Sequence, residues 1–271
     1  MVFKYLRISQ SCNMLRSRVI PCLLIQDKGL VKTVNFKNSK YVGDPINAVK
    51  IFNEKQVDEL IILDIDATIN GVDPDYQAIE YLANESRMPL CYGGGVKTAE
   101  QAKKIIQLGV EKVAVSSLAI LNPNVLIEIE RLIGRQSIIV VLDVKKTFFG
   151  TYDIYINNGK TKIKRKLEDV LEELENIGVG EFVINSIDND GVMKGYDMVL
   201  AKKVRGLIST PLTILGGAGS FDDIVELVNE FKIIGASAGS LFVFKGVYKA
   251  VLISYLTEAV LKKIQLISNK F

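Results

Sequence analysis

The stretch MPLCYGGGVKTAEQ, residues 88–101, joins a short apolar run to a glycine cluster and the start of a helix. A similar stretch, TPLTILGGAGSFDD, recurs at residues 210–223, about 122 residues later. In both, a Thr or Ser (Thr98, Ser220) precedes acidic residues, which is a typical helix start. The segments LDID (63–66) and NSID (185–188), which come before the two stretches, also match loosely. This internal repeat predicts a protein built from two similar halves.

Apolar runs of strand type alternate with helical patterns along the rest of the chain. We predict strands at 18–25, 59–65, 88–92, 111–116, 137–143, 180–186, 211–215 and 233–238. We predict helices at 44–55, 74–86, 98–108, 122–133, 166–177, 196–206, 220–230 and 245–263. Eight strands alternating with eight helices predict an α/β fold, a (β/α)8 TIM barrel made of two similar half-barrels.

The predicted domain boundaries follow from the ends of this pattern. Met14 opens the first good strand pattern, so we assign residues 14–271 to a single barrel domain and residues 1–13 to an N-terminal extension. The one long insertion is 144–165, where Asn157-Asn158-Gly159 between two strand-like runs indicates a hairpin.

Composition limits the function. A net charge of +3 over 271 residues gives no argument for nucleic acid, and no basic block stands out. No apolar run approaches the roughly 18 residues of a membrane span, and the N-terminus lacks a signal-peptide core. Three cysteines without a CxxC motif (Cys12, Cys22, Cys91) indicate reduced thiols and a cytoplasmic protein.

Histidine is absent from the whole sequence. This excludes a Ser-His-Asp triad, a Cys-His pair and a histidine metal site. Any acid–base chemistry must therefore use carboxylates, lysines, tyrosines or cysteines. We predict no metal and no cofactor.

The two glycine clusters are candidate phosphate sites, because glycine lets a backbone approach an anion closely and point N–H groups at it. Two such sites on opposite sides of a barrel mouth suggest a small molecule with two phosphates. The alternative is that the glycines only form tight turns. The candidate residues are Gly93, Gly94, Gly95 and Ser117 for the first site, and Gly216, Gly217, Gly219, Gly239 and Ser240 for the second.

Several polar residues stand at the carboxyl ends of predicted strands. Asp143, in VVLDVK, is the strongest catalytic candidate, although it could instead be a structural aspartate that accepts loop N–H groups. Asp64 and Asp190 are further candidates for the substrate site. Lys32 and Lys145 could hold a phosphate or a sugar oxygen, or could simply be solvated.

Four charges stand at the opposite, amino-terminal ends of predicted strands: Arg18, Glu59, Lys112 and Glu181. One charge before a strand is ordinary. Two cations and two anions around a barrel floor could form a closed ring of salt bridges, or could be four unrelated surface charges.

Taken together, these residues resemble the cyclase subunit of imidazole glycerol phosphate synthase, over about residues 14–255. The motifs that match in order are RVIPCL, KTVNFKN, GDP, LDI, YGGGV, LDVK, SIDNDG, GYD and GGAG. In that family a partner glutaminase docks on the barrel floor, and its ammonia passes a salt-bridged gate to the phosphate-binding mouth. There a bis-phosphorylated ribulosyl substrate is cyclised and cleaved. The resemblance assigns the gate to Arg18, Glu59, Lys112 and Glu181, and the strand-5 acid or base to Asp143.

The same resemblance identifies departures at the mouth. The family's second catalytic aspartate falls on Leu24, its Asn-Thr pair on Ser116-Ser117, its strand-6 Thr on Asn185, and a Ser on Leu215. We therefore expect impaired cyclisation. The resemblance then favours paralogues from surface-polysaccharide pathways, which pass ammonia to a sugar amidotransferase that makes an amidino sugar. An authentic cyclase of histidine biosynthesis and a barrel that only binds phosphorylated metabolites remain as alternatives.

Overall fold

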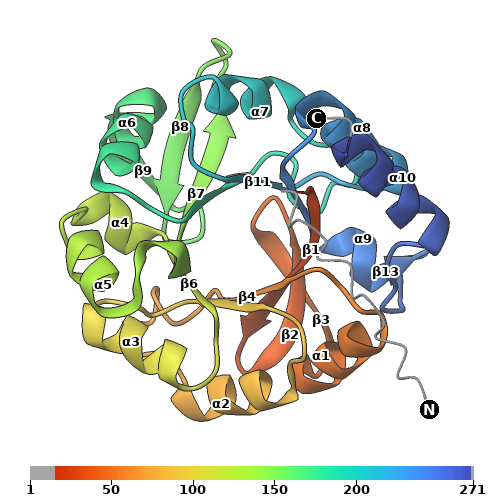
Figure 1. Ribbon diagram of the computed structural model, residues 1–271, viewed down its shortest axis with the longest axis horizontal. Helices are drawn as coiled ribbons and strands as arrows, with labels where there is room; N and C mark the ends of the chain where they lie inside the picture. The colour runs from red at the N-terminus through yellow and green to blue at the C-terminus, as the bar shows by residue number, and fades with distance from the viewer. Residues whose placement is uncertain (1–15, 270–271) are drawn as a thin grey trace, which may run out of the picture.

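The computed structural model describes residues 16–269, and it is a closed barrel of eight parallel strands inside a ring of helices (Figure 1). The predicted extension 1–13, with Cys12, lies outside the described residues. The barrel strands are β1 (Arg18–Gln26), β4 (Leu60–Asp64), β5 (Leu90–Gly93), β6 (Lys112–Val115), β7 (Ile138–Lys146), β10 (Glu181–Ser186), β11 (Leu212–Leu215) and β12 (Gly235–Ala238). Each pairs in parallel with the next, and β12 pairs with β1 to close the barrel. The predicted (β/α)8 fold is confirmed.

Helices cover the outside of the barrel. They are α1 (Pro45–Glu54), α2 (Tyr76–Glu85), α3 (Ala99–Gln107), α4 (Ser117–Leu121), α5 (Val125–Ile133), α6 (Leu167–Ile177), α7 (Met198–Arg205), α8 (Phe221–Phe231), α9 (Ser240–Val243) and α10 (Glu258–Ser268). None of the helices within residues 16–269 is long and apolar enough to cross a membrane.

The two halves repeat local details as well as their overall pattern. Thr98 and Ser220 each begin a helix with a capping box, in which side chain and backbone satisfy each other's free groups. A short helix follows the next strand in both halves, at Ser117 and at Ser240. These repeated features agree with the predicted half-barrels.

The core has two layers. An outer layer packs the strands against the helices, with Phe52, Phe182 and Phe242 among its largest fully buried side chains. A separate inner cluster fills the barrel itself, and its members are Ile20, Cys22, Ile61, Cys91, Ala114, Ile139, Val141, Val183 and Leu215. Leu24 and Leu63 pack on this inner cluster from the mouth side. Between its two ends, the inside of the barrel is therefore filled mostly by apolar side chains.

Three hairpins extend from the mouth, and only one was predicted. The insertion forms β8 (Tyr152–Ile156) and β9 (Thr161–Lys166), with Asn157, Asn158 and Gly159 in the left-handed conformation that the turn requires. Between β1 and α1 the chain forms β2 (Gly29–Val34) and β3 (Lys37–Gly43), where we had predicted only a connection.

Two predicted helices are wrong in their bounds. The helix expected at 245–263 is instead a small hairpin, β13 (Phe244–Lys245) and β14 (Ala250–Val251), followed by α10, which begins only at Glu258. Gly246 adopts a positive φ of 73°, which suits a turn and not a helix. The helix expected at 122–133 is α5, which begins only at Val125, and the short helix α4 that precedes Asn122-Pro123 was not predicted.

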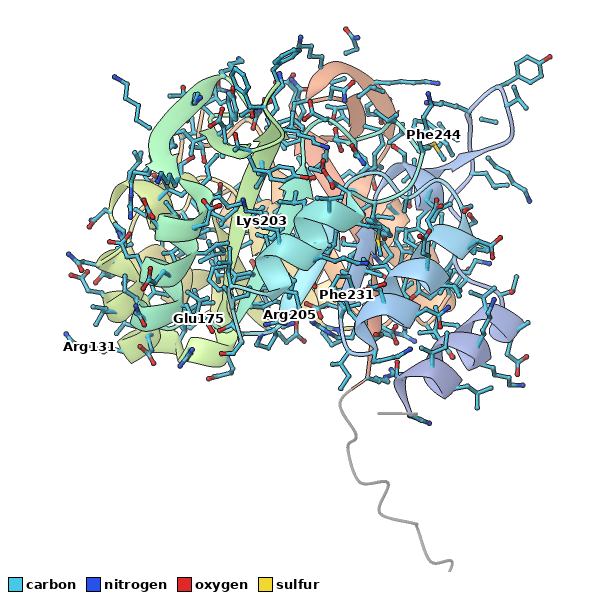
Figure 2. All side chains as sticks on the ribbon, turned by 90° about the horizontal axis from the view of Figure 1, so that it is seen from above. Arg131, Glu175, Lys203, Arg205, Phe231 and Phe244 are labelled. Carbon is cyan, nitrogen blue, oxygen red and sulfur yellow. The ribbon has the colours of Figure 1, made fainter. Side chains whose placement is uncertain are left out.

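The two ends of the barrel are distinct in side view. Figure 2 shows Phe244, near the third hairpin, towards one end, and Glu175, Arg205 and Phe231 at the opposite edge. We call the end with the hairpins the mouth, because the carboxyl ends of the barrel strands lie there. We call the other end the floor.

Candidate functional site

A pocket of about 330 Å³ opens at the mouth. Its size fits the lower end of small-molecule sites in proteins. Of the predicted site residues it gathers Lys32, Asp64, Gly93, Gly94, Gly95, Ser117, Asp143, Asn185, Asp190, Gly216, Gly217, Gly239 and Ser240. Gly219 does not line the pocket, because its N–H donates to Asp223 Oδ2 (2.8 Å) in the cap of α8.

Glycine is required at both clusters for steric reasons. A Cβ on Gly94 would lie 2.4 Å from the Asp64 carbonyl oxygen, and one on Gly217 would lie 2.1 Å from that of Gly195. Both glycines also have positive φ, of 127° and 114°. The clusters therefore form close backbone approaches at the pocket wall. This close packing would be consistent with tight turns alone as well as with anion binding.

We expect Gly94→Ala to destabilise the protein much more than Gly43→Ala. Both sites have a large positive φ (127° and 142°), so both variants strain the backbone, but nothing lies within 4 Å of a Cβ on Gly43. The clash at Gly94 should add about 1–3 kcal/mol to the loss of unfolding free energy. Urea denaturation measures the difference. Equal losses of unfolding free energy in the two variants would show that the clash with Asp64 does not affect stability.

Asp143 and Asn185 form a polar pair on neighbouring strands, β7 and β10. Asn185 Nδ2 donates to Asp143 Oδ1 (3.0 Å). Burial raises the pKa of Asp143 to about 7, although the hydrogen bond from Asn185 opposes this rise. A carboxyl group with that pKa can both release and accept a proton near neutrality, as a general acid or base must. Asn185 Oδ1 is buried and has no hydrogen-bond partner within residues 16–269.

The raised pKa of Asp143 predicts a pH effect on stability. Between about pH 4 and pH 7 the folded protein keeps a proton on Asp143 that the unfolded chain has released. This group's contribution to the free energy of unfolding must therefore fall as pH rises through that window, by about 1.4 kcal/mol per pKa unit. Asp143→Asn should remove that contribution. Urea denaturation of both proteins from pH 4 to pH 8 measures it, and parallel curves would contradict the assignment.

Lys32 is buried at the pocket wall and is not solvated. Its Nζ donates to the Cys22 carbonyl oxygen (2.5 Å), and burial lowers its pKa, against the raising effect of Asp190. Asp190 accepts a hydrogen bond from Thr33 Oγ1 (2.7 Å), and burial raises its pKa. The unpredicted hairpin β2–β3 thus delivers Lys32 and Thr33 to the site.

Asp64 also has a structural use. Its Oδ1 accepts the N–H groups of Asp66 (3.0 Å) and Ala67 (3.1 Å), so it shapes the loop after β4. Burial raises the pKa of its carboxyl group, against these two hydrogen bonds. The insertion hairpin supplies residues that sequence reasoning used only as a turn signal: Asn157 and Asn158 line the pocket, and Asn158 Nδ2 donates to the Ile65 carbonyl oxygen (2.8 Å).

Leucines occupy the centre of the pocket wall. Leu24 on β1 lies beside Leu63 in the parallel register of β1 and β4, and both line the pocket. Leu215 on β11 lines it too, next to Asn185 in register. At Leu24 no side-chain atom can transfer a proton.

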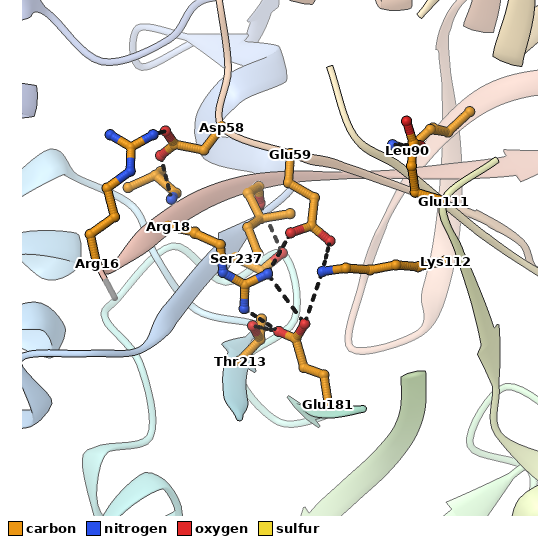
Figure 3. Close-up of polar contacts among 12 residues, drawn as sticks. Arg16, Arg18, Asp58, Glu59, Leu90, Glu111, Lys112, Glu181, Thr213 and Ser237 are labelled. Atoms are coloured by element: carbon orange, nitrogen blue, oxygen red, sulfur yellow. Dashed lines mark hydrogen bonds and ion pairs between the residues drawn. The ribbon is translucent and has the colours of Figure 1, made fainter. Parts of the chain in front are cut away.

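At the floor, the four predicted charges meet in one closed ring (Figure 3). Arg18 contacts Glu59, and its Nη2 lies 2.6 Å from Glu181 Oε1. Lys112 Nζ lies 2.7 Å from Glu59 Oε1 and 3.2 Å from Glu181 Oε2. Each cation therefore contacts both anions.

The ring is held from inside the barrel. Glu59 and Glu181 are buried, and Thr213 Oγ1 donates to Glu181. Burial pushes the pKa of Glu181 up, but Arg18 and Lys112 outweigh it and hold that pKa below its usual range. Glu181 therefore stays ionised within the ring. The reading of four unrelated surface charges is wrong.

Within residues 16–269, no group of three or more His, Cys, Asp or Glu side chains is placed to hold a metal ion. Cys22 and Cys91 are buried free thiols. Burial raises the pKa of both thiols, so neither is a ready nucleophile.

A (β/α)8 barrel with a pocket at the carboxyl ends of its strands has the arrangement of a barrel enzyme. A family model described as "Histidine biosynthesis protein" matches residues 18–249. The chain belongs to this family, as a member of the imidazole glycerol phosphate synthase cyclase subunits of HisF type. The resemblance found in the sequence is confirmed at this level.

The similar proteins fall into two groups by name. The chain is 57% identical to the putative imidazole glycerol phosphate synthase subunit hisF3 of Vibrio vulnificus (strain YJ016), over 93% of this chain and 97% of that protein. It is 54% identical to the putative subunit HisF of Leptospira interrogans, over 89% and 96%. It is 37% identical to the imidazole glycerol phosphate synthase subunit HisF of Streptococcus sanguinis (strain SK36), over 84% and 91%. Among these three, the chain is more similar to the two named as putative.

Proposed function

We propose that this chain is the barrel subunit of a glutamine amidotransferase. It receives ammonia from a partner glutaminase at the floor, passes it through the barrel, and delivers it at the mouth to a sugar amidotransferase for an amidino sugar. The observation that carries the proposal is the closed ring of Arg18, Glu59, Lys112 and Glu181. Without traffic through the floor, a ring of four charges with both carboxylates buried has no evident use, since buried ion pairs are often no more stable than apolar packing.

The interior above the ring supports passage of a neutral molecule. Ile20, Ile61, Val183 and the other members of the inner cluster offer no charged side chain between floor and mouth. Moving an ammonium ion into such surroundings costs far more than moving neutral ammonia. We propose that Arg18 and Lys112 part from their carboxylates to admit ammonia only when the glutaminase is docked.

The mouth supports delivery better than cyclisation. Asp143 keeps an acid–base group on β7, but the β1 position that would complete the pair is Leu24. One missing general acid or base costs roughly 10²–10⁴ in rate. A second candidate function, authentic cyclase action on the bis-phosphorylated ribulosyl substrate, is favoured only by Asp143 and the retained glycine clusters.

We also propose that the pocket keeps two anion sites for a phosphorylated small molecule. Gly93–Gly95 with Ser117 would form one and Gly216–Gly217 with Gly239 and Ser240 the other, while Lys32, Asp64, Asn185 and Asp190 would face the body of the ligand. Crystals grown in sulfate should show an anion at one or both clusters. Two empty clusters under those conditions would contradict this part.

The glutaminase partner can be tested by size-exclusion chromatography. The chain and its cognate glutaminase, each at micromolar concentration, should elute as one complex. Arg16→Glu, at the exposed floor beside Asp58, should weaken the complex, and Lys160→Glu, on the mouth hairpin, should not. Separate elution of the wild-type proteins would contradict the proposed function.

The buried free thiols Cys22 and Cys91 agree with a cytoplasmic setting.

A further inference from the structure

The mouth carries exposed apolar side chains that the ammonia route does not use. The turn between β7 and β8 presents Phe148 and Phe149, which are 97% and 90% exposed. The turn between β13 and β14 presents Val247 and Tyr248, which are 95% and 97% exposed. Single exposed apolar residues are common, but two turns that each present an adjacent pair are not explained by the fold.

The backbone gives these tips no structural reason to be apolar. Phe148 and Phe149 contact each other edge to face, with ring centroids 5.6 Å apart. The turn itself is closed by polar groups: Thr147 N–H donates to the Thr151 carbonyl oxygen (2.8 Å), and the two Thr hydroxyls are 2.6 Å apart. Polar side chains at the two Phe positions would leave this turn intact.

Positive charge is concentrated on these turns and on the rest of the insertion 144–166. Residues 144–166 hold seven basic side chains and one carboxylate, Asp153, and the hairpin 244–251 adds Lys245 and Lys249, in a chain whose net charge is only +3. Within residues 16–269, Lys162 pairs with Asp153 and Arg165 with Glu173. The remaining basic side chains of the insertion are exposed and form no ion pair there: Lys145, Lys146, Lys160, Lys164 and Lys166.

Both segments lie at the outlet of the barrel. Each one follows the carboxyl end of a barrel strand, β7 or β12, and Figure 1 shows both on the rim of the barrel. The floor, where the charged ring lies, is at the other end. A protein that docks on these two turns would therefore cover the mouth pocket without obstructing the floor.

We propose that the two turns, residues 144–151 and 244–251, form a docking surface for the enzyme that consumes the ammonia, and that this enzyme presents an acidic surface with apolar pockets to it. The partner's identity rests on the proposed function. Opposite charge would speed the encounter, and the four exposed apolar side chains would hold the complex. Covering the mouth would keep ammonia from water, where it would be protonated and lost.

The test uses the complex of this chain with its glutaminase, and a sugar amidotransferase from the same organism. Binding is measured by biolayer interferometry at 50 and 300 mM NaCl, and glutamine-dependent product formation is compared with that from ammonium chloride. Phe148→Ser/Phe149→Ser, Val247→Ser/Tyr248→Ser and Lys145→Glu/Lys146→Glu should each raise Kd at least about tenfold. They should lower the glutamine-dependent rate and leave the ammonium-dependent rate unchanged.

Matched controls separate this surface from general effects. Tyr81→Ser, an exposed aromatic residue on α2, and Lys103→Glu, an exposed lysine in the middle of α3, should leave Kd unchanged. Wild-type Kd in all three mouth variants would overturn the proposal, even if the glutaminase complex forms normally. Loss of the glutaminase complex itself would instead refute the proposed function.

The other occupants are tested with defined probes. A 20-base-pair DNA duplex and vesicles with phosphatidylserine are offered to the wild type and to Lys145→Glu/Lys146→Glu. The proposal is wrong if a probe binds the wild type but not the variant, and the amidotransferase binds neither the wild type nor the variant. The surface would then serve nucleic acid or membrane.

Discussion

With ammonium salt supplied directly, the wild-type chain should turn over the bis-phosphorylated ribulosyl substrate at least about 100-fold more slowly than a relative with the complete acid–base pair. The assay leaves out the glutaminase and the passage, so it reports only the chemistry at the mouth. Asp143 remains with a pKa of about 7, but the facing group on β1 is Leu24. Ring closure and cleavage each need a proton added or removed at a defined point, and one group serves only part of that sequence.

The Streptococcus sanguinis subunit, assayed in parallel, provides the reference rate. The resemblance predicts an aspartate in that subunit at the position of Leu24, and replacing it by Leu should lower the subunit's turnover towards that of this chain. Leu24→Asp in this chain should restore only a trace, because Ser116, Asn185 and Leu215 also differ from the family pattern. Wild-type turnover near that of the Streptococcus subunit would mean that Leu24 is harmless and that the chain is a cyclase.

Glu181→Gln should cost about 3–5 kcal/mol of unfolding free energy, because it removes a buried carboxylate and leaves Arg18 and Lys112 with one carboxylate between them. The pKa of Glu181 is held below its usual range. A carboxyl group with a lowered folded-state pKa stabilises above its unfolded pKa, and this contribution is lost as pH falls through the folded value. The difference in unfolding free energy between wild type and variant should therefore be largest at neutral pH and should disappear in acid, below about pH 4.

The matched control is Glu168→Gln, which breaks a partly exposed pair with Lys203. Exposed pairs contribute about 0–1 kcal/mol, so this variant should stay close to wild type. Urea denaturation at pH 7 and at about pH 3 compares all three proteins. A Glu181→Gln loss no larger than that of Glu168→Gln would show that the ring does not behave as one buried network.

The barrel could be predicted from the sequence because its strands are short apolar runs that alternate regularly with helices. The two groups of site residues could be predicted for the same reason. Parallel strands place all their carboxyl ends, which the glycine clusters follow, at one end of the barrel, and all their amino ends, with the four charges, at the other. The parallel arrangement also explains why Arg18, Glu59, Lys112 and Glu181 meet. Each one is the first residue of a barrel strand or the residue just before it, so all four lie together at the floor.

What the sequence could not predict lies in the hairpins. β3 (KNSKYVG) is polar, and Val42 is its one buried residue. β2 (GLVKTV) buries Lys32 and Thr33 beside Leu30 and Val31, so neither strand shows a clear alternation of apolar residues. The hairpin 244–251 interrupts a segment that resembles a helix in composition, and a single glycine carries the turn. Net charge also concealed the basic mouth, because the lysines of 144–166 are offset by carboxylates elsewhere in the chain.

Hydrogen exchange on the chain with and without its glutaminase tests the central claim most directly. We predict slower exchange in the loops that precede barrel strands, at 55–59, 109–112 and 178–181, on the floor around the charged ring. The turns at 145–151 and 246–249, on the mouth, should exchange as in the free chain. Protection at those mouth turns, or no protection at the floor with the glutaminase at saturating concentration, would contradict the account that ammonia enters this barrel through its floor.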